Sequence, residues 1–328
     1  MRLPALPELL ATAQVVSLPL RTRFRGIDAR EALLLEGPEG WTEFSPFVEY
    51  DDTEAAAWLR AAIEFGWERS AEPLRSTVRV NATVPAVPAS AVPGVLARFP
   101  GCRTAKVKVA ERGQVLADDV ARVAAVRQAM GPEGRVRIDA NGWWNVDEAE
   151  HALNALAGFD LEYAEQPCTT VDELAELRER IGSYLDIPIA ADESVRKASD
   201  PLAVARAGAA DLLVIKAQPL GGIRAALAII AEAGLPVVIS SALETSVGIA
   251  MGAQLAAAVP GLEFDCGLGT ASLLAADVTG DPLRARDGMI PVGRVDADPA
   301  LLTRHAASAE RRDWWLARLE RTYALLGA

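Results

Sequence analysis

The sequence predicts an α/β protein: a parallel barrel of alternating strands and helices, preceded by a smaller region of strands followed by a helix. Beyond residue 76, eight short apolar segments alternate with helix-sized stretches rich in Ala, Leu and Arg. Such alternation is typical of right-handed βα units on a parallel sheet, and eight units favour closure into a barrel over an open sheet. The 328 residues, 51% of them apolar, can bury a core of that size.

The N-terminal region is predicted to contain strands at 14–25 and 31–36, with a turn at the G-P-E-G of 37–40 before the W-T-E-F of 41–44. Asp51, Asp52 and Thr53 offer a helix start, and 54–65 has a helical composition. The barrel strands are expected at 77–84, 104–110, 135–141, 161–167, 187–194, 211–218, 236–244 and 263–270.

The C-terminal segment 312–326 is predicted to be a helix with Trp315, Leu319 and Tyr323 on one stripe. We expect this stripe to pack back on the N-terminal region.

The chain carries a net charge of −12 and a pI near 4.8, which argues against nucleic acid or an anionic membrane as a partner. A small-molecule carboxylate substrate remains compatible, because a bound metal and a few lysines set the local field. The three cysteines, Cys102, Cys168 and Cys266, form no C-x-x-C and fit a reducing compartment. With no signal peptide and no apolar run of membrane-spanning length, a cytoplasmic protein is expected; the sequence leaves the oligomeric state open.

Lysine is rare here, with four lysines against twenty-nine arginines, yet three of the four lie in predicted strands. Lys106 and Lys108 share one face of their strand, and Lys216 lies late in the strand at 211–218. Arg suffices where only positive charge is needed, whereas the pKa of a Lys amine can be lowered until it takes and returns a proton. The alternative is that these lysines merely extend from strand ends, but three of four in strands favour proton-transfer chemistry.

Three carboxylates, Asp139, Glu165 and Asp192, come at the ends of successive predicted strands, each about one βα unit from the next. The carboxyl ends of barrel strands gather at one rim. Neighbouring carboxylates repel each other unless a cation lies between them, and oxygen ligands without His or Cys suit Mg²⁺ or, as a substitute, Mn²⁺. Three separate ion pairs with arginines are the alternative interpretation.

A metal ion at this rim could bind a substrate carboxylate and stabilise the enediolate that forms when the neighbouring carbon loses its proton. Lys108 is the expected base, its pKa lowered by the metal and by Lys106. Lys216, across the barrel, is either a second base or a cation that faces the intermediate.

The motifs K-V-K (106–108), D-A-N (139–141), E-Y-A-E-Q-P (162–167), A-D-E-S (191–194) and V-I-K (214–216) follow the order seen in the muconate lactonizing subgroup of the enolase superfamily, which the chain resembles over nearly its whole length. The resemblance implies a (β/α)7β modified TIM barrel at 77–284, with an α+β capping domain built from 1–76 and 285–328. It also implies that Asp139, Glu165 and Asp192 bind Mg²⁺, and that Lys108 and Lys216 flank the substrate.

Within that subgroup, the segments 81–86, 240–246 and 267–270 resemble those of the o-succinylbenzoate synthases. The resemblance implies a lyase that eliminates water from 2-succinyl-6-hydroxy-2,4-cyclohexadiene-1-carboxylate to give o-succinylbenzoate in menaquinone biosynthesis, with Lys108 as base and then acid. An N-acylamino acid racemase with Lys108 and Lys216 as opposed bases needs the same residues and stays open. The residues expected to contact the substrate are Ser240, Ser241, Gly267, Gly269 and Arg25.

Overall fold

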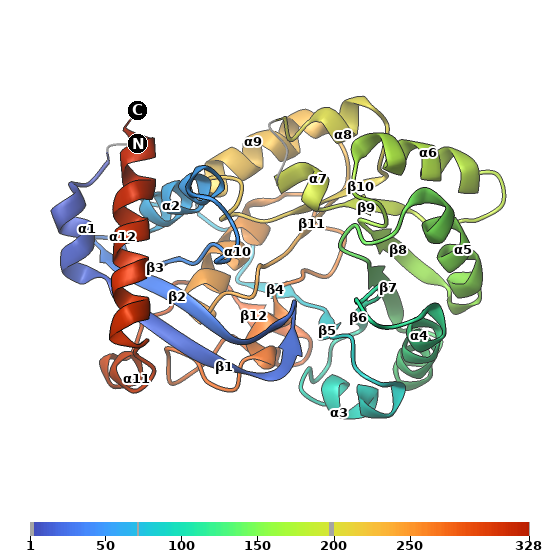
Figure 1. The fold of residues 1–328 in the computed structure, drawn as a ribbon, viewed down its shortest axis with the longest axis horizontal. Coiled ribbons are helices and arrows are strands. Elements are labelled where there is room, and N and C mark those ends of the chain that lie inside the picture. Colours follow the sequence, from blue (N-terminus) through green and yellow to red (C-terminus); the bar gives the residue numbers. More distant parts are fainter. Residues whose placement is uncertain (1–2, 71, 197–199, 328) are drawn as a thin grey trace.

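The computed structural model describes residues 3–70, 72–196 and 200–327. At one end of the molecule lies an antiparallel sheet in the order β1-β2-β3, beside which helices from both ends of the chain pack (Figure 1). Its elements are β1 (Gln14–Phe24), β2 (Ile27–Gly37), β3 (Gly40–Phe44), α1 (Leu6–Thr12), α2 (Asp52–Trp67) and α12 (Ala309–Leu326). The strands, turn and helix predicted for this region are therefore present.

The apolar stripe of α12 determines how the C-terminal helix packs. Trp315 and Leu319 are fully buried, and the ring of Trp315 meets Phe44 of β3 edge-on with centroids 5.9 Å apart. The indole N–H of Trp315 donates to Glu31 of β2 at 2.9 Å, which satisfies its one polar group. The C-terminal helix packs on the N-terminal sheet, as its stripe predicts.

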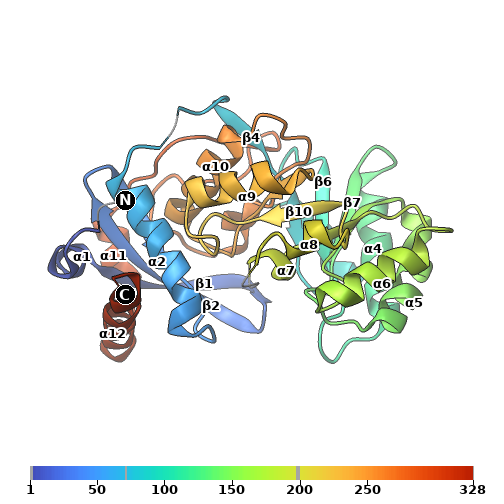
Figure 2. The same ribbon diagram turned by 90° about the horizontal axis from the view of Figure 1, so that it is seen from above.

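A curled parallel sheet in the order β11-β10-β9-β8-β7-β6-β5 makes up the second part of the molecule. Figure 2 shows α4, α5 and α6 together on the outside of this sheet. Its strands are β5 (Ala82–Val84), β6 (Thr104–Lys108), β7 (Arg135–Asp139), β8 (Leu161–Glu165), β9 (Ile189–Ala191), β10 (Leu212–Ile215) and β11 (Val237–Ile239).

The α-helices of this part are α3 (Val92–Leu96), α4 (Leu116–Met130), α5 (Val146–Leu156), α6 (Val171–Ile181), α7 (Glu193–Arg196), α8 (Ala203–Arg206), α9 (Ile223–Ala233) and α10 (Ser246–Ala258). Helix α11 (Pro299–Arg304) instead lies beside β1 at the other end of the molecule (Figure 1). Short 3-10 turns are η1 (Ala89–Ala91), η2 (Ala157–Phe159) and η3 (Gly269–Leu273). In the part of the chain that the structure describes, no helix is long and apolar enough to cross a membrane.

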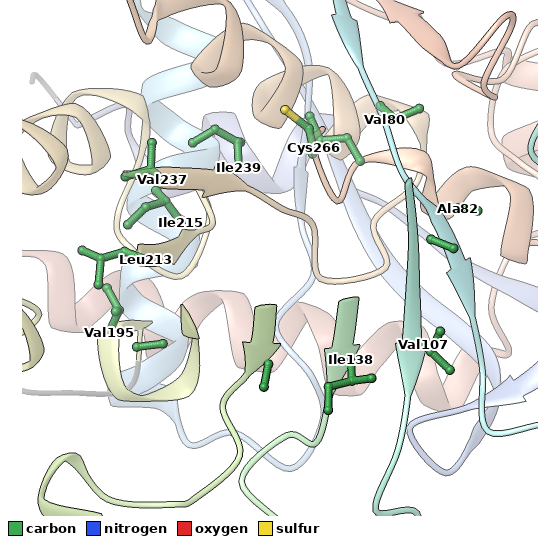
Figure 3. Close-up of a cluster of buried hydrophobic side chains, with 14 of the residues drawn as sticks. Val80, Ala82, Val107, Ile138, Val195, Leu213, Ile215, Val237, Ile239 and Cys266 are labelled. Atoms are coloured by element: carbon green, nitrogen blue, oxygen red, sulfur yellow. The ribbon is translucent and has the colours of Figure 1, made fainter. Parts of the chain in front are cut away.

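The two faces of the parallel sheet differ in character because strand side chains alternate. One face is apolar along its length and packs with helix residues in a single core cluster, which includes Val107, Ile138 and Ile215 (Figure 3). The opposite face carries a small apolar cluster with Tyr163 and Val214. Glu165 follows Tyr163 by two positions, and Lys216 follows Val214 by two, so each charged residue lies on the same face as the apolar one before it. The inner face therefore changes from apolar to charged toward the carboxyl ends of the strands.

Two predicted strands differ from expectation. The strand at 77–84 is divided: β4 (Thr77–Arg79) pairs antiparallel with β12 (Met289–Pro291), and only β5 joins the parallel sheet. The predicted strand at 263–270 is wrong as a regular strand, since the chain makes only isolated parallel bridges there, Val80 with Cys266 and Ser240 with Gly267, before η3 begins. Glycines weaken a strand and favour a turn. The two bridging partners nevertheless flank the edge strands of the parallel sheet, since Val80 precedes β5 and Ser240 follows β11.

Candidate active site

The three predicted carboxylates lie side by side at the carboxyl ends of neighbouring strands. The register pairs Asp139 of β7 with Glu165 of β8, and Glu165 with Ala190 of β9. Asp192 follows two residues after Ala190 and so lies on the same face. Each of the three carboxylates is only 1% exposed.

Two lysines of β6 approach two of these carboxylates. Lys106 Nζ lies 2.9 Å from Glu165 and 3.1 Å from Asp139, and so bridges them. Lys108 Nζ lies 2.5 Å from Asp139. The sequence placed both lysines on one strand face, and the structure directs both into the cluster of acids.

The third carboxylate is bound from the other side. Lys216 Nζ lies 2.6 Å from Asp192. Arg196 of α7, which was not predicted from the sequence, lies 3.2 Å from Asp192 and 2.6 Å from Glu193. Its only sequence signal is its position four residues after a predicted ligand, in the first turn beyond the strand.

Two side chains just past the strand ends orient the charged groups. Asn141 Oδ1 accepts a hydrogen bond from Lys108 at 2.7 Å, and Gln166 Oε1 accepts one from the backbone N–H of Asp192 at 2.9 Å. Both residues have positive φ, 50° and 40° respectively. Such conformations cost free energy in residues other than glycine and cluster at functional sites. The role of Gln166 was not predicted from the sequence.

The pKa values of the two lysines of β6 are shifted in opposite directions. Burial lowers the pKa of the Lys108 ammonium below its usual value, against the attraction of Asp139. Burial also opposes charge on Lys106, but Glu165 and Asp139 outweigh it and raise the pKa of Lys106 well above its usual range. Lys108 is therefore the lysine better suited to take and return a proton.

The pKa values of Asp139 and Glu165 are also shifted in opposite directions. Burial would raise the pKa of Asp139, but Lys108 and Lys106 hold it below its usual range. Burial and the negative charge of Asp139 raise the pKa of Glu165 to about 7. Glu165 is thus the carboxylate whose charge is least compensated by the surrounding cations.

The reactive ends of the lysines open into an inner cavity of about 30 Å³. It adjoins an outer cavity of about 1060 Å³, and both are lined by Phe24, Arg25, Lys108 and Asn141. An outer space of that size is in the range of small-molecule sites. The predicted site residues that line the inner cavity are Arg25, Lys106, Lys108, Asp139, Lys216, Ser240, Ser241 and Gly267.

The predicted glycines do not supply free backbone donors to this cavity. The N–H of Gly267 donates to the carbonyl of Ile239 at 2.8 Å. Gly269 does not line the cavity, and a Cβ placed on it would lie 2.7 Å from the carbonyl oxygen of Asn81. Hydroxyl groups line this wall instead: Ser241 Oγ lies 2.8 Å from Thr270 Oγ1. Thr270 was missed in the sequence because an isolated Thr after a glycine carries no distinctive signal.

The carboxylates of the site are oxygen donors of the type that bind divalent cations. Within the described ranges, no three His, Cys, Asp or Glu side chains converge on a common point. The physical reason is that the Lys106 ammonium already bridges Asp139 and Glu165 at oxygen-to-cation contact distances. A cation is thus held between these carboxylates, and hard oxygen ligands suit Mg²⁺. In donor type, the carboxylates Asp139, Glu165 and Asp192 therefore fit Mg²⁺.

The fold and this rim of lysines and carboxylates define an enolase-type protein. Residues 95–296 match the family model described as enolase C-terminal domain-like, and residues 15–66 match the one described as enolase N-terminal domain-like. A 2-chloromuconate cycloisomerase from Rhodococcus opacus superposes with a TM-score of 0.74 at 24% identity, over 90% of this chain and 98% of its own. The L-Ala-D/L-Glu epimerase of Bacillus subtilis does so with 0.72 at 22% identity, over 87% and 96%. At these identities the likeness concerns the fold alone.

Sequence relatives narrow the assignment. A protein of Mycobacterium ulcerans named o-succinylbenzoate synthase is 56% identical over 98% of this chain and 96% of its own length. One of the same name from Mycolicibacterium smegmatis is 54% identical over 98% of each. The chain belongs to the o-succinylbenzoate synthase family of the enolase superfamily.

Proposed function

We propose that the protein catalyses the Mg²⁺-dependent elimination of water from 2-succinyl-6-hydroxy-2,4-cyclohexadiene-1-carboxylate to give o-succinylbenzoate, a step of menaquinone biosynthesis. The observation that carries this proposal is the position of Lys108. Its buried amine lies at the boundary of the inner and outer cavities, beside the carboxylate rim. A substrate carboxylate held at the rim would present its neighbouring C–H bond to this amine.

Lys108 acts twice in this reaction. Its neutral amine takes the proton from the ring carbon beside the substrate carboxylate, and the resulting ammonium gives that proton to the departing hydroxyl group, which leaves as water. The C–H and C–O bonds break, a ring double bond forms, and the ring becomes aromatic. The lowered pKa of Lys108 favours the neutral amine that the first step needs.

The other cations stay charged and stabilise negative charge. Lys106 keeps its proton because Glu165 and Asp139 raise its pKa. Lys216, paired with Asp192 on another wall of the inner cavity, faces the anionic intermediate. The three rim carboxylates would hold Mg²⁺, which would supply Lewis-acid chemistry to the substrate carboxylate.

The charge balance favours a dianionic substrate. Four carboxylates of the site, including Glu193, are matched by four cations, including Arg196. With Lys108 neutral, as the first step requires, this set and a divalent ion together carry one positive charge, and Arg25 on the cavity wall adds a second. The two carboxylates of the proposed substrate neutralise these two charges. We assign its contacts in the inner cavity to Arg25, Ser240 and Ser241.

We also infer a (β/α)7β barrel at 77–284 with a capping domain formed from 1–76 and 285–328. Cys266 and Gly267 support this inference, because they bridge to opposite edges of the parallel sheet. The packing of Trp315 on Phe44 supports a capping domain built from both chain ends.

A second candidate is a 1,1-proton transfer on an N-acylamino acid. The observation that favours it is that Lys108 and Lys216 both line the inner cavity. Proton exchange from both faces of one carbon requires two such bases. The names of the relatives at 54–56% identity favour the dehydration.

The test is the ultraviolet absorbance of the cyclohexadiene substrate with wild type and with Lys108→Ala, each with and without Mg²⁺. We expect metal-dependent loss of the diene band in the wild type and a loss of rate of roughly 10²–10⁴-fold in the variant. A wild type that leaves the diene band unchanged with Mg²⁺ rejects the dehydration. Exchange of the α-proton of N-succinyl amino acids in D₂O then decides on the second candidate.

A further inference from the structure

Arg122 of α4 is a fully buried cation that the chemistry described so far does not use. Its guanidinium binds three separate segments behind the active site. Nε donates to the carbonyl of Val87 at 2.7 Å, Nη1 donates to the carbonyl of Lys108 at 2.8 Å, and Nη2 donates to the side-chain oxygen of Gln114. The Arg122 side chain therefore binds the backbone of Lys108, the proposed base. It also binds the segments that follow β5 and β6, at Val87 and Gln114.

Asp119, one turn before Arg122, completes the anchor. Its Oδ1 accepts from Arg122 at 2.7 Å, and its Oδ2 accepts from the backbone N–H of Ala110 at 2.9 Å. Ala110 has a φ of 60°, so the chain turns in the left-handed region two residues after Lys108. Gln114 extends the connection by donating to the carbonyl of Ala86 at 2.9 Å. The turn at 109–114 is thus held from the helix behind it.

Packing alone does not require this ion pair, because well-packed apolar residues of similar volume often replace buried ion pairs without loss of stability. Placement of a flexible amine does require a fixed backbone. A Lys side chain has four rotatable bonds, and small misplacements of a reacting group reduce rates strongly. Ala86, Lys108 and Gln114 all line the outer cavity, so the same anchor also shapes the substrate wall.

We propose that Arg122 and Asp119 are positioning residues that hold the backbone of Lys108 and the turn at 109–114, so that the amine meets the substrate carbon. The proposal rests on the assignment of Lys108 as the base.

The test compares Arg122→Met with Arg127→Met. Arg127 is a matched control on the same helix, since its guanidinium also binds backbone carbonyls, those of Phe159 at 2.8 Å and Asp160 at 2.8 Å. Those carbonyls precede β8, at the opposite end of the sheet from the cavity. Arg122→Met should lower kcat roughly 10²-fold with KM within about threefold of wild type. It should also enlarge the primary isotope effect with substrate deuterated at the reacting carbon, whereas Arg127→Met should keep both values.

A folded Arg122→Met with wild-type kcat and isotope effect overturns the proposal. An equal loss of kcat in Arg127→Met also overturns it, because the role would then be structural only. Should Arg122→Met fail to fold, Asp119→Asn replaces it, and a folded Asp119→Asn with wild-type kcat has the same consequence.

Amide hydrogen exchange gives a reading that needs no turnover. Arg122→Met, or Asp119→Asn in its place, should speed exchange at 109–114, and Arg127→Met should not. Unchanged exchange at 109–114 contradicts the anchor. A wild type that fails to dehydrate the diene rejects the proposed function, and the exchange measurement then decides on the anchor separately.

Discussion

Replacing Glu43 by Gln should stabilise the protein above pH 7. Glu43 lies fully buried on β3, where one of its oxygens accepts from Thr245 Oγ1 at 2.6 Å and from the N–H of Gly248 at 3.1 Å. Its other oxygen accepts from Ser45 Oγ at 2.5 Å. Burial and the neighbouring Glu244 raise the pKa of Glu43 to about 7.

The sign and size of the effect follow from proton linkage. The folded protein binds this proton more tightly than the unfolded chain, in which the pKa of Glu43 is near 4.5. The contribution of Glu43 to stability is therefore fully present below pH 4.5 and is lost as the pH rises through 7. At about 1.4 kcal/mol per pKa unit, the loss is about 3 kcal/mol. A Gln keeps the acceptor for Thr245 and Gly248, donates to the Ser45 hydroxyl and has no charge to bury.

The assay is urea unfolding of wild type and Glu43→Gln between pH 5 and pH 8. The free energy of unfolding of the variant minus that of wild type should increase by about 2.5 kcal/mol over this range, because a smaller part of the loss already occurs below pH 5, and the m-values should be equal. Glu310→Gln, an exposed position on α12, is the control and should give a constant difference. A Glu43→Gln difference that stays constant within about 0.5 kcal/mol would refute the reasoning.

Three further outcomes follow from the same structure. Mg²⁺ at about 100 times its Kd should stabilise the wild type by about 2.7 kcal/mol and raise its Tm. Asp192→Asn should lose most of this gain. Calorimetry that finds no Tm shift in the wild type would contradict the metal site. Lys216→Ala should slow dehydration less than Lys108→Ala, because Lys216 compensates charge without moving the proton; equal losses of kcat would argue for two bases. Trp315→Ala should lower the free energy of unfolding by about 3–5 kcal/mol in urea, and a loss under about 1 kcal/mol would mean that α12 packs without this ring.

The site shows where sequence patterns succeed. Strand alternation and the rim rule placed Lys106, Lys108, Asp139 and Lys216 on one face, and the structure has them around one cavity. These rules need only the local period of the chain and the common direction of parallel strands. They say nothing about Arg196, whose contact with Asp192 depends on how the first turn of the next helix is placed.

Sequence patterns also could not predict contacts between segments that are distant in the chain. The anchor of Arg122 joins a helix to the carbonyls of Val87 and Lys108, and carbonyls carry no sequence signal. Gly269 belongs to a segment that resembles the family, yet the structure packs it against Asn81 and away from the cavity.

The sequence by itself determined the order of the strands and helices, the packing stripe of the last helix and the residue types at the carboxyl rim, because hydrophobic periodicity encodes which face of an element is buried. Only the tertiary structure decided that 77–84 divides between two sheets and that 263–270 joins the sheet edges through single bridges. Only the tertiary structure decided which lysine ammonium forms an ion pair with which carboxylate. Strand pairing and ion pairing depend on the register and position of a distant partner, and no local pattern contains that information.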